Sequence, residues 1–358
     1  MSKRIGVLVV DDSVLMRKIL TSLLQSDPAI EVLGAAGDAA KARELIRALN
    51  PDVLTLDIEM PGMDGLSFLR KIIELRPMPV IMISTLTQHG ADITLEALEV
   101  GAVDFIQKPA SQGDDMLECF RRELCEKVKQ AANLRVGLRR AQRRAQQRRV
   151  ALPRRASLVA IGASTGGVES LRAVLMNMTA ACPPVVVTQH MPPRFTEAFA
   201  NRLNRICPVR VREAAHGDAI RPGEVLIAPG SHHLTVIRRG RNFYCALDDH
   251  APVSGHRPSV DVLFRSVATA VGAEALGVIL TGMGKDGAAG MLAMRQAGAM
   301  TIGQNEESAL IYGMPREAFE RGAVERQLPL EAIGGAIMSA WQPEETATGA
   351  GAAIGVGS

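Results

Sequence analysis

Short runs of consecutive aliphatic residues alternate with longer amphipathic stretches along the first 130 residues. We expect the short runs to form strands at residues 5–10, 31–34, 53–56, 80–83 and 103–107. Between them, apolar residues recur at helical spacing, which predicts helices over 14–24, 39–48, 65–75 and 93–100. Unbroken aliphatic strands that alternate with helices are typical of a parallel sheet covered on both faces.

The same alternation returns after residue 157. Strands are expected at 158–161, 185–188, 225–228 and 277–280, and helices at 194–204, 260–270 and 290–296. The predicted fold class is therefore α/β, with two doubly wound parallel-sheet domains. We expect the first domain at residues 1–130, a linker at 131–156, the second domain at 157–342 and a disordered tail at 343–358.

Charge is concentrated in the linker. The formal net charge of the chain is +3, but without nine linker arginines it would be −6. These are Arg135, Arg139, Arg140, Arg143, Arg144, Arg148, Arg149, Arg154 and Arg155. Contact with an acidic partner or nucleic acid is one interpretation, but the segment has no aromatic residue for base stacking. We therefore favour a solvated Arg-rich linker and expect no nucleic-acid partner.

Cysteine usage and the amino terminus indicate the compartment. Five dispersed cysteines without CxxC spacing argue against a disulfide framework or a zinc site. Charged residues come too early for a signal peptide, and no apolar run has membrane-spanning length. We expect a cytoplasmic protein without direct membrane insertion.

Carboxylates follow two strands of the first domain. Asp11 and Asp12 come after the first strand, and Asp57 comes after the run at 53–56. Like charges at one sheet edge need a cation, and an oxygen-only set suits Mg²⁺. A carboxylate beside Mg²⁺ can accept a phosphoryl group, whose oxygens Lys108 and the Ser84 hydroxyl would then hold.

Three residues at strand ends of the second domain predict nucleophilic catalysis. Ser164, His190 and Asp286 each follow a strand, so they should meet at one edge of the sheet. They suit acyl transfer, with Ser164 as nucleophile, His190 as base and Asp286 orienting the imidazole. Amides near Thr165 and Met283 would bind the oxyanion.

Other interpretations of the second domain were weighed. G-A-S-T-G fits the G-x-S-x-G motif of α/β-hydrolases, but that fold orders its triad Ser, acid, His, whereas His190 precedes Asp286 here. A dinucleotide site lacks its middle glycine and its acidic residue. His256, or the pair His232 and His233, could supply the base instead, although both lie in predicted loops. His256 stays a candidate substrate-site residue.

The first domain resembles a response-regulator receiver domain. The resemblance implies Asp57 as phosphoacceptor, Asp11 and Asp12 as the acidic Mg²⁺ pocket, and Ser84 and Lys108 as switch residues. Phe105 matches the aromatic residue that reports phosphorylation. Residues 59–65 (EMPGMDG) match the loop after the acceptor.

Residues 157–340 resemble the catalytic domain of chemotaxis protein-glutamate methylesterases. The motifs are IGASTGG (161–167), TQHMPPRFTEAFANRLN (188–204), APGSHHL (228–234), HRPSVDVLF (256–264), TGMGKDGAAGM (281–291) and GMPREA (313–318). The resemblance implies the triad named above, acting on methylated glutamates of chemoreceptor cytoplasmic helices, with deamidation of receptor glutamines and no cofactor for ester hydrolysis.

Together these features predict a phosphorylation-regulated esterase. The receiver domain would cover the active-site edge until a chemotaxis histidine kinase phosphorylates Asp57, which shifts the population towards an open arrangement. The alternative is a response regulator whose second domain only binds a partner.

Overall fold

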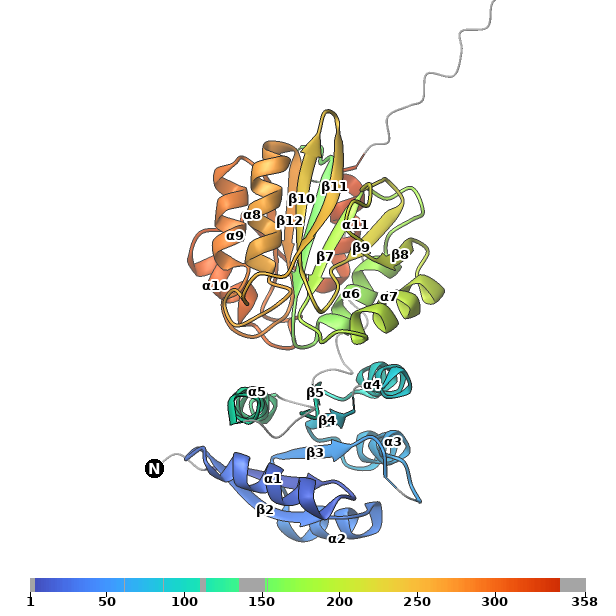
Figure 1. Ribbon diagram of the computed structural model, residues 1–358, viewed down its shortest axis with the longest axis vertical. Coiled ribbons are helices and arrows are strands. Elements are labelled where there is room, and N and C mark those ends of the chain that lie inside the picture. The colour runs from blue at the N-terminus through green and yellow to red at the C-terminus, as the bar shows by residue number, and fades with distance from the viewer. Residues whose placement is uncertain are drawn as a thin grey trace, which may run out of the picture.

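The computed structural model describes residues 4–60, 62–85, 87–109, 114–134, 152 and 154–341. Most of the predicted linker and the tail at 343–358 lie outside these ranges. Within the ranges, the chain forms two α/β units, one above the other (Figure 1).

The first unit is a five-stranded parallel sheet in the order β2-β1-β3-β4-β5. Its strands are β1 (Ile5–Val10), β2 (Ile30–Ala36), β3 (Val53–Asp57), β4 (Val80–Ser84) and β5 (Asp104–Gln107). Its helices are α1 (Val14–Gln25), α2 (Ala39–Leu49), α3 (Gly65–Leu75), α4 (Gln88–Val100) and α5 (Asp114–Ala132).

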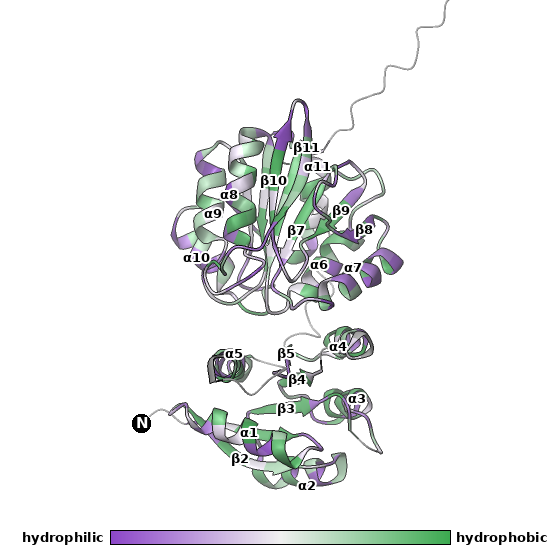
Figure 2. Cartoon of the chain, in the orientation of Figure 1, coloured by the Kyte–Doolittle hydropathy of each residue, from purple (hydrophilic) through white to green (hydrophobic). Residues whose placement is uncertain are grey.

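Both faces of this sheet are covered, as the unbroken strands predict. Val7 and Val9 of β1 join the core formed with α1 and α5, while Leu8 and Val10 join the core formed with α2 and α3. Figure 2 shows β3 in hydrophobic colour, in keeping with a fully buried strand. Helix α5 was not among the predicted helices, and α4 begins earlier than predicted, at a cap formed by Thr87.

The second unit is a seven-stranded sheet in the order β14-β13-β12-β6-β7-β9-β8, and all neighbouring strands are parallel. Its strands are β6 (Leu158–Ala163), β7 (Val185–Gln189), β8 (Arg210–Glu213), β9 (Glu224–Ile227), β12 (Ala275–Ile279), β13 (Met300–Gln304) and β14 (Arg326–Leu328). Its helices are α6 (Gly167–Met176), α7 (Phe195–Ile206), α8 (Val260–Ala270), α9 (Ala288–Gln296), α10 (Met314–Glu320) and α11 (Leu330–Ser339).

Strands β8, β13 and β14 and helices α10 and α11 were not among the predicted elements, and two further local features differ from the sequence pattern. An antiparallel hairpin of β10 (His233–Arg239) and β11 (Asn242–Asp248) is added outside the parallel sheet. Strand β6 does not end at Gly162 but continues to Ala163. A Cβ at Gly162 would lie 2.2 Å from Val260 Cγ1, so the glycine is needed for the close approach of α8 rather than for a turn.

The first unit packs against the edge of the second sheet at which its strands end (Figure 1). The rings of Phe105 from β5 and Phe195 from α7 stack at 4.7 Å between centroids. Arg202 of α7 forms a two-pronged ion pair with Glu99 of α4. One apolar cluster contains residues of both units, so the contact continues the hydrophobic core.

Candidate active site

Ser164 follows β6 directly. Its amide donates to the carbonyl oxygen of Thr281 at 3.0 Å, and its own carbonyl accepts from Gly167 at 2.7 Å, so the backbone is fixed on both sides. Gly166 caps α6 with a φ of 76°, a left-handed conformation that glycine adopts without strain. This turn holds the hydroxyl at the edge of the sheet, as predicted.

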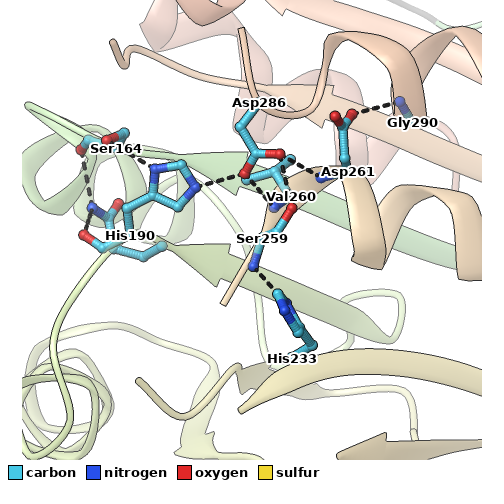
Figure 3. A network of polar contacts seen from close by, with 9 residues as sticks. Ser164, His190, His233, Ser259, Val260, Asp261, Asp286 and Gly290 are labelled. Carbon is cyan, nitrogen blue, oxygen red and sulfur yellow. Dashed lines mark hydrogen bonds and ion pairs between the residues drawn. The ribbon is translucent and has the colours of Figure 1, made fainter. Parts of the chain in front are cut away.

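The Ser164 hydroxyl and the Asp286 carboxylate lie at the two nitrogens of one imidazole (Figure 3). His190 Nδ1 is 3.2 Å from Ser164 Oγ, and His190 Nε2 is 2.8 Å from Asp286 Oδ2. An ionised carboxylate only accepts hydrogen bonds, so Nε2 carries the proton. The lone pair of Nδ1 then faces the serine hydroxyl.

The amino terminus of α8 surrounds Asp286 with donors (Figure 3). The Ser259 hydroxyl donates to Oδ1 at 2.8 Å, and the amides of Val260 and Asp261 donate to Oδ2 and Oδ1 at 2.7 and 3.1 Å. Burial alone would raise the pKa of Asp286, but the contact with His190 and these donors outweigh burial and lower it. The carboxylate is therefore held ionised.

The two amides expected to bind an oxyanion lie at the same edge. Thr165 and Met283 both line a cavity of about 1130 Å³ that also contains Ser164 and His190. Met283 follows Gly282, where a Cβ would come within 2.8 Å of Ser164 Cβ. Within the described ranges, the amides of Thr165 and Met283 donate to no protein acceptor, so both are available to a ligand.

The other histidines occupy different positions. His233 lies in β10, not in a loop as expected, and its Nδ1 accepts from the Ser259 amide at 3.1 Å (Figure 3). His232 contacts the Ser231 hydroxyl. His256 lies in the loop before α8, and its ring stacks on that of His190. Of these imidazoles, His190 is the one between Ser164 and Asp286.

The predicted acidic cluster forms at the strand ends of the first sheet. Asp11, Asp12 and Asp57 each offer an oxygen atom, and these atoms lie within 4.8 Å of one another. Lys108 Nζ is 3.0 Å from Asp11 Oδ2 and 2.9 Å from Asp57 Oδ2. Burial raises the pKa of Asp57 to about 6, although Lys108 acts to lower it.

Ser84 and Phe105, the two remaining residues of the predicted switch, lie outside the acidic cluster. Ser84 is buried, and its hydroxyl accepts from Thr94 Oγ1 at 2.9 Å. Phe105 is buried in the contact with the second unit, against Phe195. Asp104, which precedes Phe105 in β5, contacts the active site itself. Thr165 Oγ1 donates a hydrogen bond to Asp104 Oδ2 at 2.5 Å.

Two residues of this site, Ser259 and Asp104, were not identified from the sequence, and His256 was named only as an alternative base or a candidate substrate-site residue. Ser259 precedes the apolar run of α8, which is an N-cap signal, so that signal was available. For the stacking of His256 and for the contact of Asp104 with Thr165, the sequence carries no local signal, because both depend on which loops meet in space.

Comparisons with known proteins show the families to which the two units are similar. Residues 159–337 match the CheB methylesterase family, and residues 7–121 match the response regulator receiver domain. A protein-glutamate methylesterase/protein-glutamine glutaminase 1 of Rhizobium johnstonii is 56% identical over 347 residues, covering 94% of this chain and 97% of the relative. A protein of that name from Caulobacter vibrioides is 54% identical over 338 residues, with the same two coverages.

A solved structure is similar to the second unit. The crystal structure of the Thermotoga maritima CheB methylesterase catalytic domain covers 51% of this chain and 97% of its own, with 35% identity and a TM-score of 0.50. The names of these relatives support the esterase interpretation and not a second domain that only binds.

Proposed function

This chain belongs to the CheB methylesterase family and carries a response regulator receiver domain, and from that premise we propose that Ser164, His190 and Asp286 hydrolyse protein-glutamate methyl esters. The supporting observation is the hydroxyl–imidazole–carboxylate chain, with heavy-atom distances of 3.2 and 2.8 Å at one sheet edge. This geometry suits a serine nucleophile with a positioned base.

The first half of the reaction releases methanol. His190 Nδ1 takes the proton of Ser164 Oγ as the oxygen attacks the ester carbonyl carbon, and Asp286 stabilises the imidazolium that forms. The amides of Thr165 and Met283 donate to the oxyanion. When the bond between the acyl carbon and the methoxy oxygen breaks, Nδ1 returns the proton to the leaving methoxy oxygen.

The second half restores the enzyme. His190 Nδ1 takes a proton from water, whose oxygen attacks the acyl-serine, and Nδ1 then protonates Ser164 Oγ as the glutamic acid group leaves and loses its remaining proton to solvent. With a glutamine substrate the leaving group is ammonia, which corresponds to the glutaminase part of the relatives' name.

We propose that the first unit receives a phosphoryl group on Asp57. Asp11, Asp12 and Asp57 form an oxygen-only set that fits Mg²⁺, and Lys108 adds a cation to the same pocket. Bound Mg²⁺ would neutralise the charge of the phosphoryl oxygens. The chain's own residues supply the acceptor oxygen and, through Lys108 and Ser84, contacts for the phosphoryl group.

Regulation would act through the contact between the two units. The Asp104–Thr165 hydrogen bond and the Phe105–Phe195 stack tie the receiver domain to the active-site edge. Phosphorylation of Asp57 would favour an arrangement in which these contacts are released, which opens the cavity to a receptor helix. We take residues 1–130, 131–156 and 157–342 as the receiver, linker and catalytic parts.

The proposed partners are methylated cytoplasmic helices of chemoreceptors as substrate and a chemotaxis histidine kinase as phosphodonor. Both place the reaction in the cytoplasm. In the part of the chain that the structure describes, no helix combines the length and the apolar character needed to cross a membrane.

A methanol-release assay on methylated receptor membranes tests the site. Ser164→Ala should release no methanol above background, while Ser157→Ala, at the opposite end of β6, should match the wild type. Equal release from Ser164→Ala and wild type would reject the proposed nucleophile.

A second assay tests regulation. Asp57→Asn should lose stimulation by a phosphodonor and keep the basal rate of the unphosphorylated wild type. Stimulation that persists in this variant would reject Asp57 as the controlling acceptor.

A further inference from the structure

We propose that His256 is a positioning residue that holds the His190 imidazole in the plane joining Ser164 to Asp286. The inference rests on the proposed function of that triad. The two imidazole rings stack with 3.7 Å between centroids and 12° between planes. His190 is thus fixed at one ring edge by Asp286 and on one ring face by His256.

The backbone around His256 is itself held firmly. Its amide donates to the Val253 carbonyl at 3.0 Å, and the Val253 amide donates back to the His256 carbonyl at the same distance. Ser254 and Gly255 turn between them with positive φ angles. The next residue, Arg257, is also held in place, because its guanidinium donates to the carbonyl oxygens of Asp249 and His250. The ring is therefore presented by a rigid loop.

Ring stacking matters because the imidazole works through both nitrogens. A tilt out of the common plane lengthens the contacts to Ser164 Oγ and Asp286 Oδ2 together, and small displacements of reacting groups are costly in rate. The hydrogen bond to Asp286 restrains one edge of the His190 ring but does not by itself keep the ring from tilting out of this plane. A flat ring packed on the imidazole face removes this freedom.

His256 is suited to the position because it stays neutral. Burial, followed by the charge of His190, lowers the pKa of His256, while Asp286 acts to raise it. Lys127 and Arg122, which line the cavity from α5, also act to lower it. A second cation at 3.7 Å would oppose protonation of His190, whereas a neutral ring leaves the proton to the base.

Two substitutions separate positioning from other roles. His256→Phe keeps a flat, uncharged ring, and His256→Ala removes it. In methanol release by the phosphorylated full chain, we expect His256→Ala to lower kcat by about tenfold to a hundredfold with nearly unchanged KM. His256→Phe should keep kcat within about threefold of the wild type, because its ring keeps the packing contact with His190. If KM rises in both variants at constant kcat, His256 contacts the substrate and the proposal is wrong.

A second measurement does not depend on turnover. The ¹H–¹⁵N NMR signal of His190 Nε2–H should show a hydrogen-bonded proton in the wild type and in His256→Phe, and should lose its protection from exchange in His256→Ala. An unchanged signal in His256→Ala overturns the proposal even if no protein releases methanol. Loss of methanol release in the wild type with the expected NMR pattern would instead count against the proposed function alone.

Discussion

The Asp286 carboxylate depends on a single buried hydroxyl for part of its position. Ser259 and the Asp261 amide share its Oδ1, while Oδ2 is shared by His190 and the Val260 amide. Each oxygen therefore has two donors, and removing one weakens the restraint on the orientation of the carboxylate. Since Oδ2 orients the catalytic imidazole, a change at Oδ1 reaches His190 through the same rigid group.

Ser259→Ala is accordingly expected to lower kcat about tenfold, because a hydrogen bond to a charged group contributes about 1.5–3 kcal/mol. KM should change little, since Ser259 is fully buried behind Asp286. Methanol-release kinetics measure both values. Thr269→Ala, on the exposed side of the same helix, serves as the control. Equal kcat in the two variants would show that the backbone amides alone position Asp286.

Strand ends were enough to predict which residues meet, but not how they meet. Ser164 and His190 each follow a strand of one parallel sheet, so their proximity follows from topology. The choice of Nδ1 for the serine and Nε2 for the carboxylate depends on loop conformations around Asp286. The stacking of His256 has the same origin, since its loop is fixed by contacts that no periodicity reveals.

Among the helices, α3 begins with a charged cap whose contribution depends on pH. Asp64 Oδ1 accepts from the Ser67 amide at 2.7 Å, and Oδ2 accepts from the Ser67 hydroxyl at 2.9 Å. The backbone hydrogen bond from Ser67 is the main reason that the pKa of Asp64 is lowered. A carboxylate with a lowered pKa in the folded state stabilises the fold above its unfolded pKa, and this contribution is lost as the pH falls.

Asp64→Ala should therefore lower the free energy of unfolding by about 1 kcal/mol at pH 7, as for other lost N-caps. The difference from the wild type should shrink as the pH falls below about 4, where the Asp64 carboxyl of the unfolded chain becomes protonated while that of the folded chain is still ionised. Urea unfolding at several pH values measures it. Asp64→Asn keeps an oxygen acceptor and should lose less at pH 7. A pH-independent difference for Asp64→Ala would exclude a contribution from the charge.

The five strands of the first unit were all predicted, whereas β8, β13 and β14 of the second sheet were not. Buried parallel strands are continuous aliphatic runs, and β1 lies where its run was expected. Helix α5 was missed although Phe120, Leu124 and Val128 form an apolar stripe at helical spacing, the same signal that identified the other helices. The antiparallel β10–β11 hairpin interrupts a parallel pattern, so a prediction based on alternating strands and helices did not include it.

For the molecule as a whole, Asp104 is a receiver residue that directly contacts the active-site edge. Its Oδ2 accepts from Thr165 Oγ1, next to Ser164, while Lys127 pairs with its Oδ1 at 3.4 Å. Asp104→Ala should raise the basal rate of methanol release severalfold, because it weakens the closed arrangement, and should leave the phosphorylated rate unchanged. Glu44→Ala, on exposed α2, is the control. An unchanged basal rate would mean that this contact does not hold the domains closed.

The mutual packing of the two domains was predicted from family resemblance, whereas their order along the chain was predicted from the residue pattern. The contact pairs join positions far apart in the sequence, such as Asp104 with Thr165 and Glu99 with Arg202. No hydrophobic periodicity marks them, because each of these polar residues is also compatible with a solvated surface. The buried aromatic residues of the interface, Phe105 and Phe195, do have the character of core positions.

The Glu99–Arg202 ion pair allows the closed arrangement to be tested by exchanging charges. Glu99 lies on α4 and Arg202 on α7, and both side chains are partly buried by the domain contact. Glu99→Arg or Arg202→Glu places like charges together, so each should raise basal methanol release by about two- to fivefold, as expected for a pair worth up to about 1 kcal/mol.

The double exchange restores attraction and should return the basal rate to the wild-type value. All three variants should reach the same rate once Asp57 is phosphorylated, because the pair is absent from the open arrangement. A double variant as active as the single ones would show that this pair is not part of the contact that restrains the enzyme.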